Sequence, residues 1–454
     1  MSTPATDTAA PKVYFKTMGC QMNEYDTGKM RAQLLLDGYV ETDDPAEASL
    51  VLVNTCSIRD KAEQKLHSVL GEYRRMKREG QPVTIGVAGC VAQQEGKKLL
   101  DRYGDIDLVF GPDGIPQIRN LVKAAKVTGR VLDTEYLDLD NYPFVSDLDP
   151  ASKGRVGAFV TIQKGCDNNC TFCIVPTTRG KEASRPWQEI VDETRRLVDT
   201  GVKEITLIGQ NVNSYGLKNP DDIPFSELLY KVHAVEGVER IRYTTSHPRD
   251  ITDELIQAYA ELPKLTSQLH LPVQSGSNRV LRRMRRYYTR ERFLDIVAGL
   301  KKARPDLALG TDIIVGFPGE TDEDFELTMQ LMEEVGFVSS YSFKYSPRPG
   351  TPALNMVHKR GEGVSEEVAQ ERLMRWQKRQ RELAQAFHTS LEGTVQDVLV
   401  EGWSKHDPGV ICGRTSTFAM INFPGSLKLV GKTVPVRVTK GFTNSARGEQ
   451  VVEA

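Results

Sequence analysis

The chain has 454 residues, 39% of them hydrophobic, and a formal net charge of −2 at pH 7. This length predicts two to four domains, and the near-neutral charge excludes a uniformly cationic protein, so any nucleic-acid surface must be a local patch. No run approaches the ~18 apolar residues of a membrane-spanning helix, and residues 1–11 lack the features of a signal peptide. An odd number of cysteines, seven, does not suit a secreted disulfide framework. We therefore expect a cytoplasmic protein with a disordered N-terminal tail and no membrane partner.

Three apolar runs in the first third of the chain each lead directly to a cysteine. Residues 13–19, 50–55 and 83–89 precede Cys20, Cys56 and Cys90. Helices are expected between these runs, at residues 26–37 and 58–78, and a strand at 108–110 with a further helix completes the pattern. The alternation predicts an open α/β domain with a parallel sheet over residues 11–130.

The three cysteines would then lie at the carboxyl edge of that sheet, where open α/β sheets bind ligands. Neighbouring strands are ~4.8 Å apart, so three strand ends span ~10 Å, which suits an iron–sulfur cube. A single cysteine at a strand end is more often a small buried hydrophobe. A cysteine at the end of each of three strands indicates instead that these cysteines are metal ligands.

An acidic stretch with two prolines predicts a linker at residues 131–151, and a longer repeat follows it. Strands are expected at 158–163, 204–208, 240–245, 267–271, 307–315 and 338–343. Helices are expected between them, for example at 187–199, 252–261, 290–304 and 322–335. Six β/α units predict a partial TIM-like (βα)6 barrel, open on one side, within a domain at 152–384.

Three more cysteines, Cys166, Cys170 and Cys173, follow the first barrel strand with the spacing C-x3-C-x2-C. The loop therefore lies at the carboxyl face of the barrel, where such folds keep their chemistry. Three thiolates on an iron–sulfur cube leave one iron open, which favours chemistry over scaffolding. A zinc site with a fourth ligand from elsewhere is the alternative, although no second C-x2-C or H-x3-H pair is present.

Five arginines between residues 279 and 286 form a basic run next to Tyr287 and Tyr288. The run is either a solvated helix face or a contact surface for RNA phosphates and bases. Beyond a helical stretch at 366–391, short strands at 394–401, 409–413, 418–423 and 433–439 predict a small OB-like β-barrel at 385–454. Cys412 is expected to be a buried thiol.

The segment 165–173 resembles the signature of the radical S-adenosylmethionine (SAM) enzymes. The segments 17–23, 53–59 and 89–93 resemble the methylthiotransferase domain, and Gly413-Arg414-Thr415 resembles part of a TRAM domain, a module associated with tRNA binding. The whole chain is similar to the radical SAM methylthiotransferase family. Within this family, segments 21–23 and 60–65 favour the tRNA-2-methylthio-isopentenyladenosine synthase (MiaB) type, whereas the run 282–288 carries less glycine than is usual.

The resemblance implies two 4Fe-4S clusters, one held by Cys20, Cys56 and Cys90 and one, which chelates SAM, held by Cys166, Cys170 and Cys173. It implies no catalytic residue beyond these cluster ligands. Residues at the barrel strand ends would bind SAM: Gln210, Asn211, Ser246, Gln274, Ser275 and Asp312. Residues that would contact RNA are Arg282, Arg285, Arg286 and Arg414.

The implied reaction is methylthiolation of C2 of isopentenylated adenosine at tRNA position 37, with two SAM molecules. One SAM methylates sulfur at the first cluster, and the other yields a radical that removes the C2 hydrogen. The target base is expected to be splayed out of its stack between the barrel and the N-terminal domain. Implied partners are tRNA, an electron donor such as flavodoxin or ferredoxin, and iron–sulfur assembly proteins.

Two alternatives stay open at the level of sequence. The same chemistry could act on a ribosomal protein aspartate or on threonylcarbamoyl adenosine. A different class of function is a non-catalytic, metal-containing RNA-binding protein.

Overall fold

The computed structural model describes residues 10–57, 60–139, 142–218, 222–405 and 407–452. It divides the chain into two compact units. The first contains residues 1–151, 164–167 and 174–183, and the second contains 152–163, 168–173 and 184–454. The expected N-terminal tail up to residue 9, residues 58–59 of the expected second helix and residues 140–141 of the expected linker lie outside the described residues.

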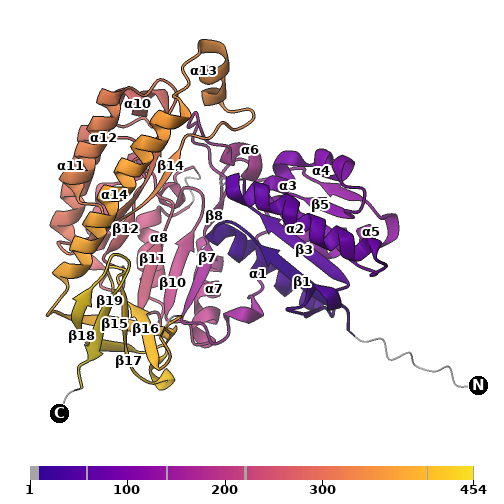
Figure 1. Ribbon diagram of the computed structural model, residues 1–454. Helices are drawn as coiled ribbons and strands as arrows, with labels where there is room; N and C mark the ends of the chain where they lie inside the picture. The colour runs from indigo at the N-terminus through magenta and orange to yellow at the C-terminus, as the bar shows by residue number, and fades with distance from the viewer. Residues whose placement is uncertain (1–9, 58–59, 140–141, 219–221, 406, 453–454) are drawn as a thin grey trace, which may run out of the picture. The chain divides into compact units, whose positions relative to one another are not determined.

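The first unit is built on a six-stranded parallel sheet with the order β2-β1-β3-β4-β5-β6 (Figure 1). Its strands are β1 (Lys12–Thr17), β2 (Val40–Glu41), β3 (Leu50–Thr55), β4 (Thr84–Gly89), β5 (Leu108–Phe110) and β6 (Val131–Asp133). Its helices are α1 (Gln21–Leu36), α2 (Asp60–Arg78), α3 (Cys90–Glu95), α4 (Lys97–Arg102), α5 (Ile118–Thr128) and α6 (Val175–Arg179). The open parallel α/β sheet expected from the sequence is confirmed.

Apolar residues of the central strands alternate between the two faces of this sheet. In β3, Val51 and Val53 pack with α2 and α4, whereas Leu50 and Leu52 pack with α1 and α5. Helix α1 begins at Gln21, five residues earlier than expected, because Cys20 takes the extended conformation of a helix N-cap. Neither β2 nor β6 is predicted by the sequence, since two or three residues are too few to show a period.

The second unit contains six parallel strands in sequence order, β7-β10-β11 and β12-β13-β14 (Figure 1). A bridge between Ile241 and Leu265 connects the two sets. The strands are β7 (Gly157–Thr161), β10 (Glu204–Ile208), β11 (Arg240–Tyr243), β12 (Gln268–His270), β13 (Ala308–Val315) and β14 (Ser339–Lys344). The expected partial (βα)6 barrel is confirmed.

Helices alternate with these strands, and side-chain caps fix where several of them begin. They are α7 (Trp187–Asp199), α8 (Phe225–His233), α9 (Asp253–Glu261), α10 (Asn278–Arg283), α11 (Arg290–Ala303), α12 (Asp322–Val335), α13 (Pro352–Arg360) and α14 (Glu366–Ser390). Thr321 and Asp324 form a reciprocal capping box at the start of α12. The bounds of α7 and α12 are those predicted. Short strands β8 (Gln163–Lys164) and β9 (Ala183–Ser184) flank the cysteine loop in the sequence.

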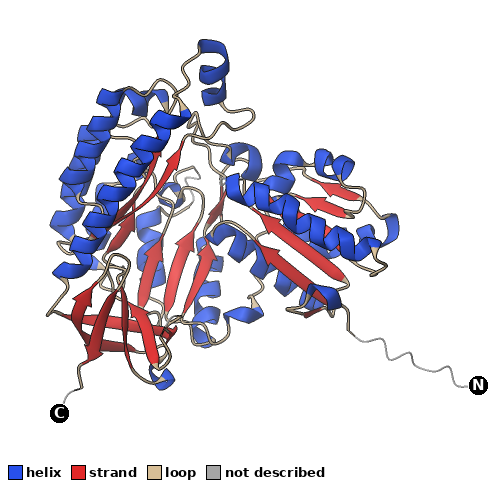
Figure 2. Ribbon diagram, in the orientation of Figure 1, coloured by secondary structure: helices blue, strands red, loops and turns tan. Residues whose placement is uncertain are grey.

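The C-terminal module is a closed five-stranded barrel with the order β15-β16-β17-β19-β18 (Figure 2). Its strands are β15 (Val395–Trp403), β16 (Val410–Arg414), β17 (Met420–Pro424), β18 (Thr433–Gly441) and β19 (Ala446–Gln450). The β-barrel is confirmed, but β19 was not predicted, because its sequence Ala-Arg-Gly-Glu-Gln lacks β-branched and aromatic residues. None of the described helices is both long and apolar enough to cross a membrane.

The closed barrel attaches to the amino ends of β11 and β12. Arg240, the first residue of β11, donates hydrogen bonds to the backbone carbonyls of Arg414 and Asp397. The Ser416 hydroxyl accepts a bond from the N–H of Ser267 at 2.8 Å. Helix α14 contacts both β14 and β18, and Trp376 of α14 is fully buried and donates to the Ser340 hydroxyl at 2.8 Å. These contacts join the closed barrel to the (βα)6 barrel.

We predict that Trp376→Ala lowers the free energy of unfolding of the second unit by roughly 3–5 kcal/mol, because it opens a cavity in the core. Trp403→Ala is the matched control, since Trp403 is 50% exposed, and it should cost about 0.5 kcal/mol or less. The three tryptophans of the chain, Trp187, Trp376 and Trp403, all lie in the second unit. Their fluorescence during urea unfolding therefore reports on that unit, and equal midpoints for the two variants would contradict the prediction.

Candidate metal and cofactor site

Cys20, Cys56 and Cys90 follow three adjacent strands of the first unit, β1, β3 and β4, at their carboxyl ends. Cys20 caps α1, Cys56 follows β3 directly, and Cys90 is the first residue of α3. The thiols of Cys20 and Cys56 share a hydrogen bond, and the guanidinium of Arg179 interacts electrostatically with both Cys20 and Cys90. The structure thus brings the three predicted cysteines to one edge of the sheet, with one cation beside two of them.

Two glycines permit this close approach. Gly19 has a φ of +134°, and a Cβ on it would lie 2.3 Å from the Cβ of Cys56. Gly89 has a φ of +90°, and a Cβ there would lie 2.4 Å from the Oδ1 of Asn54. Both conformations favour glycine, and a methyl group at either position would push two cysteine-bearing strand ends apart.

A buried ion pair provides the positive charge at this edge. Arg179, in α6, donates to the Asp26 carboxylate of α1 at 2.6 Å, and both side chains are buried. Burial alone would lower the pKa of Arg179, but the charges of Asp26, Cys90 and Cys20 outweigh it and raise the pKa. The guanidinium therefore stays charged beside the thiols.

The thiol of Cys20 responds to the same environment. The hydrogen bond from Cys56 and the charge of Arg179 lower the pKa of Cys20 to about 6, although burial opposes them. Thiolates are the metal-binding form of cysteine. The donor set at this edge, three thiols with one held ready for deprotonation, fits an iron–sulfur cluster.

A second buried ion pair lies in the same unit. Lys164 donates to Asp113 at 2.6 Å, and the Tyr142 hydroxyl donates to the same carboxylate at 3.2 Å. Neither pair is predicted by the sequence. Their only local signal is that Lys164 and Arg179 flank the C-x3-C-x2-C loop, one on each side.

The cysteine loop itself is divided between the units, with Cys166 in the first and Cys170 and Cys173 in the second. In the first unit, the N–H of Cys166 donates to the Gly180 carbonyl at 3.2 Å. In the second, the N–H of Thr171 donates to Met284, and the Thr171 carbonyl accepts from Ala353. Among the described residues, no group of three or more His, Cys, Asp or Glu side chains is placed to hold a single metal ion. In a cube, each thiolate binds a different iron.

Arg286 is the nearest charged partner of Cys170. Its guanidinium donates to the Cys170 sulfur at 3.4 Å and to the Pro272 carbonyl at 2.8 Å, and the residue is 5% exposed. Arg286 was predicted to contact RNA, and in this structure its side chain is enclosed in the fold. It supplies a fixed positive charge to the sulfur of Cys170.

Several polar atoms at the carboxyl ends of the barrel strands are buried without a partner. Within the described part of the chain, no hydrogen bond reaches Asn211 Oδ1, Ser246 Oγ or His247 Nε2. The side-chain oxygen and nitrogen of Gln163, just after β7, are in the same state. Unpaired buried polar atoms cost free energy. A polar ligand such as SAM would satisfy them, so these residues fit the cofactor.

His247 was not among the predicted site residues, yet the protonation state of its ring is well defined. Burial, with the charges of Arg286 and Arg249, lowers its pKa to about 2. Its Nδ1 accepts a bond from the N–H of Arg249 at 3.2 Å, so Nε2 carries the proton. His247 is thus a neutral hydrogen-bond donor with its donor unused.

The other predicted SAM residues differ in their surroundings. Gln210 follows β10 and is partly buried. The N–H of Gln274, which has a φ of +72°, donates to the Asp312 carbonyl, and the Asp312 carboxylate lies 2.9 Å from His270 Nε2. Ser275 is fully buried and its hydroxyl accepts from the N–H of Ser277, so that this hydroxyl is used within the fold.

The remaining predicted RNA residues are more accessible than Arg286. Arg282 and Arg285 are exposed. Arg414 is partly buried, pairs with Glu401 and lies over the ring of Phe418 at 4.5 Å.

A partial (βα)6 barrel with a C-x3-C-x2-C loop after its first strand defines a radical SAM enzyme. Comparison with known families agrees: the Radical SAM superfamily matches residues 160–332, the uncharacterized protein family UPF0004 matches 12–111 and the TRAM domain matches 389–451. SAM and 4Fe-4S clusters are accordingly its cofactors.

Two relatives match over nearly the full length of the chain. A tRNA-2-methylthio-N(6)-dimethylallyladenosine synthase of Geobacter metallireducens is 47% identical over 97% of this chain and 98% of its own length. The enzyme of the same name from Nitrosospira multiformis is 46% identical over 97% of this chain and 93% of its own length. The chain belongs to the family of tRNA-2-methylthio-N(6)-dimethylallyladenosine synthases and is a radical SAM methylthiotransferase.

Among solved structures, the fold is similar to the radical SAM methyltransferase TsrM of Kitasatospora setae. The TM-score is 0.57 at 15% identity, covering 78% of this chain and 79% of that one. The cobalamin-dependent radical SAM enzyme OxsB matches with a TM-score of 0.54 at 12% identity over 80% of this chain and 56% of that one. At these identities the likeness concerns the fold alone.

We predict that Arg179→Gln lowers the stability of the first unit by roughly 3–5 kcal/mol, because it leaves Asp26 as a buried unpaired charge. Iron bound per chain should fall as well. The Arg179 variants should be made in a protein that also carries Cys166→Ala, Cys170→Ala and Cys173→Ala. The bound iron then measures only what Cys20, Cys56 and Cys90 hold. Arg179→Lys should restore part of the iron.

Arg379→Gln provides the control for this prediction, since Arg379 pairs with Glu333 on the surface with 38% and 50% of the two side chains exposed. Such pairs are worth about 0–1 kcal/mol. Full iron binding by Arg179→Gln would show that the thiols do not depend on this cation.

Proposed function

We propose that the chain methylthiolates C2 of isopentenylated (dimethylallyl) adenosine at tRNA position 37, using two SAM molecules and two 4Fe-4S clusters. The first cluster is assigned to Cys20, Cys56 and Cys90, and the second to Cys166, Cys170 and Cys173. The observation that carries the proposal is that the first three cysteines follow the carboxyl ends of three adjacent strands, with Cys20 hydrogen-bonded to Cys56 and with Arg179 beside Cys20 and Cys90. A radical SAM enzyme that only abstracts hydrogen would have no use for a second set of three thiols.

When bound, the clusters and SAM supply the sulfur chemistry and the hydrogen-abstracting radical. The chain itself holds and orients these groups. Arg179 and Arg286 place fixed positive charge next to the sulfurs of the two cysteine sets, which stabilises anionic thiolates. Asn211, Ser246 and His247 offer buried hydrogen-bonding atoms to the polar groups of SAM.

The names of the full-length relatives favour adenosine in tRNA over the two alternative substrates. The match to a TRAM domain supports an RNA substrate. A ribosomal protein aspartate and threonylcarbamoyl adenosine have no comparable support here, and neither does a non-catalytic RNA-binding role. An electron donor such as flavodoxin or ferredoxin, iron–sulfur assembly proteins as partners and a cytoplasmic location belong to the same proposal.

The direct test is an anaerobic reaction of the reconstituted protein with SAM, a reductant and an anticodon stem-loop that carries dimethylallyl adenosine. We expect the modified nucleoside to gain a methylthio group in place of a hydrogen, as measured by mass spectrometry, and 5′-deoxyadenosine to form. Cys170→Ala should abolish both products. Cys56→Ala should abolish methylthiolation while 5′-deoxyadenosine still forms, since Cys56 belongs to the other set.

The same RNA with unmodified adenosine or with threonylcarbamoyl adenosine tests the choice of substrate. Equal product from threonylcarbamoyl adenosine would contradict the proposed specificity. Formation of 5′-deoxyadenosine with no change in any RNA would point to a protein substrate.

We further predict that His247→Phe weakens SAM binding by about 2- to 12-fold, the value of one hydrogen bond of roughly 0.5–1.5 kcal/mol. Phenylalanine keeps the ring and removes the N–H donor. Because His247 stays neutral at a pKa of about 2, SAM affinity should not vary with its titration between about pH 6 and pH 8. Equilibrium dialysis of the reconstituted protein measures both effects.

The control variant is His358→Phe, since His358 is exposed on α13. It should leave SAM affinity unchanged. Unaltered affinity in His247→Phe would remove His247 from the cofactor site.

A further inference from the structure

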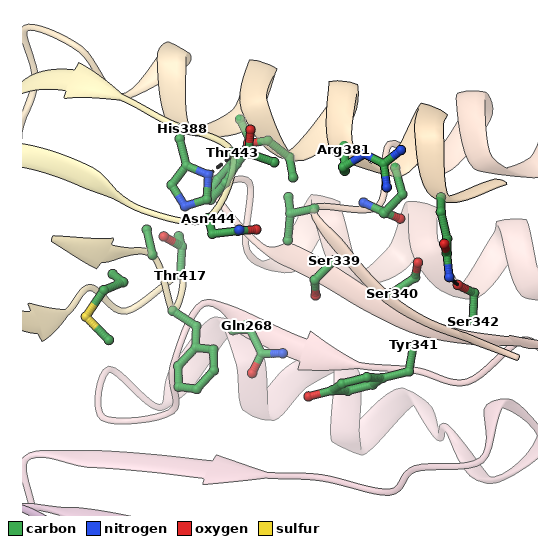
Figure 3. A pocket seen from close by; sticks show the side chains of 18 of the residues that line it. Gln268, Ser339, Ser340, Tyr341, Ser342, Arg381, His388, Thr417, Thr443 and Asn444 are labelled. Atoms are coloured by element: carbon green, nitrogen blue, oxygen red, sulfur yellow. Dashed lines mark hydrogen bonds between the residues drawn. The ribbon is translucent and has the colours of Figure 1, made fainter. Parts of the chain in front are cut away.

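A hollow of about 670 Å³ lies within the second unit, where the (βα)6 barrel meets the closed barrel. Its walls come from β14, from α14, and from two turns of the closed barrel, after β16 and after β18. Figure 3 shows Arg381 and His388 on the helix, Tyr341 and the serines on the strand, and Thr417, Thr443 and Asn444 from the closed barrel. Hollows of roughly 300–1,000 Å³ are the usual size of ligand sites.

The hollow begins at the amino ends of β12 and β14 and extends along β14 as far as Phe343. Gln268 is the first residue of β12 and Ser339 the first of β14, and both line it. The residues assigned to SAM follow the carboxyl ends of their strands or lie toward those ends. Since β14 has six residues at ~3.3 Å each, about 17 Å separates the two ends. The end of the hollow at Gln268 and Ser339 is therefore distant from the loops that follow the strands, whereas Tyr341, further along its wall, pairs in register with Asp312.

The described lining of the hollow combines apolar side chains with polar ones and contains no acidic group. None of the described residues that line it is Asp or Glu, in a chain with 61 acidic residues. Arg381 is exposed and forms no hydrogen bond or ion pair with any described residue. Gln268 and Asn444 add amides, and Thr417 adds a hydroxyl. Such a wall suits a ligand with negative charge and many hydrogen-bonding atoms.

Three aromatic rings are exposed in the hollow: Tyr341 at 59%, Phe418 at 42% and Phe343 at 41%. Phe418 has a φ of +70°, a conformation that is an outlier for a bulky residue and is concentrated at ligand clamps. The guanidiniums of Arg242 and Arg414 lie 4.0 Å and 4.5 Å from its ring centroid. The fold thus holds an apolar ring in a strained conformation at a place where solvent still reaches it.

We propose that this hollow binds one unstacked nucleotide of the RNA substrate, other than the nucleotide that is modified. The base stacks on Phe418 or Tyr341, and its phosphate pairs with Arg381. Exposed aromatic rings and an unpaired arginine are the groups that recognise single-stranded RNA. An acidic peptide would use Arg381 but would not use the exposed aromatic rings. This proposal rests on the proposed function, because it takes RNA as the substrate.

The test measures binding of the fluorescently labelled anticodon stem-loop to the full-length holoenzyme. Phe418→Ala and Tyr341→Ala should each raise the Kd by about 5- to 150-fold, the loss of one stacked base. Arg381→Gln should lower the slope of log K against log salt concentration by roughly 0.7. The formation of 5′-deoxyadenosine without RNA should remain unchanged in all three variants, since none of these residues belongs to the cofactor site.

Matched controls lie outside the hollow. Phe442→Ala removes a ring that is 37% exposed on the same closed barrel, and Arg292→Gln removes an exposed arginine of α11. Both should bind RNA as the unaltered protein does. Normal RNA affinity in all three hollow variants would overturn the proposal, and so would an equal loss in the controls.

A second measurement uses the unaltered protein. The stem-loop is substituted with 4-thiouridine, irradiated, and the crosslinked peptides are mapped by mass spectrometry. Crosslinks within residues 339–343 or 414–420 support the proposal, and crosslinks confined to other segments overturn it. Protection of those segments by a polyglutamate peptide, without RNA crosslinks, would assign the hollow to an acidic protein partner.

The outcomes also separate this proposal from the function on which it rests. An unaltered protein that neither binds nor modifies the stem-loop refutes both. An unaltered protein that modifies the stem-loop, with hollow variants that bind it equally well, refutes only the hollow.

Discussion

The first unit depends on placing a positive charge inside a hydrophobic sheet edge. Taking the Arg179 guanidinium out of water costs several kcal/mol, which only close anionic partners offset. The Asp26 carboxylate is one such partner, and the sulfurs of Cys20 and Cys90 are others. The ion pair therefore ties α6 to α1 and fixes where anionic sulfur is tolerated. The left-handed glycines at positions 19 and 89 complete this arrangement, because they let the strand ends approach each other.

The second unit buries several polar atoms that have no hydrogen-bond partner among the described residues. These atoms are Asn211 Oδ1, Ser246 Oγ, His247 Nε2 and the two polar side-chain atoms of Gln163, although Asp250 and Arg249 hold Asn211 and His247 through Nδ2 and Nδ1. Such burial costs stability in the absence of a ligand. It also means that the hydrogen-bonding groups are already desolvated and oriented, which is what preorganised cofactor sites require. Arg286 follows the same principle next to Cys170, because its position is fixed by Pro272 rather than by solvent.

The sequence predicted the features that arise from local patterns. The apolar runs before Cys20, Cys56 and Cys90 predicted strands whose ends lie at one sheet edge, and the bounds predicted for α12 agree with the structure. Ion pairs between residues that are distant in the sequence produce no local pattern, so they could not be predicted. Arg179 and Asp26, for example, are 153 residues apart. The charge run 279–286 shows the same limit, since composition could not reveal that Arg286 is buried while Arg282 and Arg285 are exposed. His247 was missed because a single histidine at a strand end has no periodic signal.

Helix α14 has 25 residues, which corresponds to a rod of about 37 Å at 1.5 Å per residue. It packs on β14 along part of its length and on β18 of the closed barrel near its end, and Trp376 and Gln380 bond it to the (βα)6 barrel. One uninterrupted rod thus sets the spacing between the two barrels. A molecule that enters between them meets walls that are already in place, so little conformational entropy is lost on the protein side when it binds.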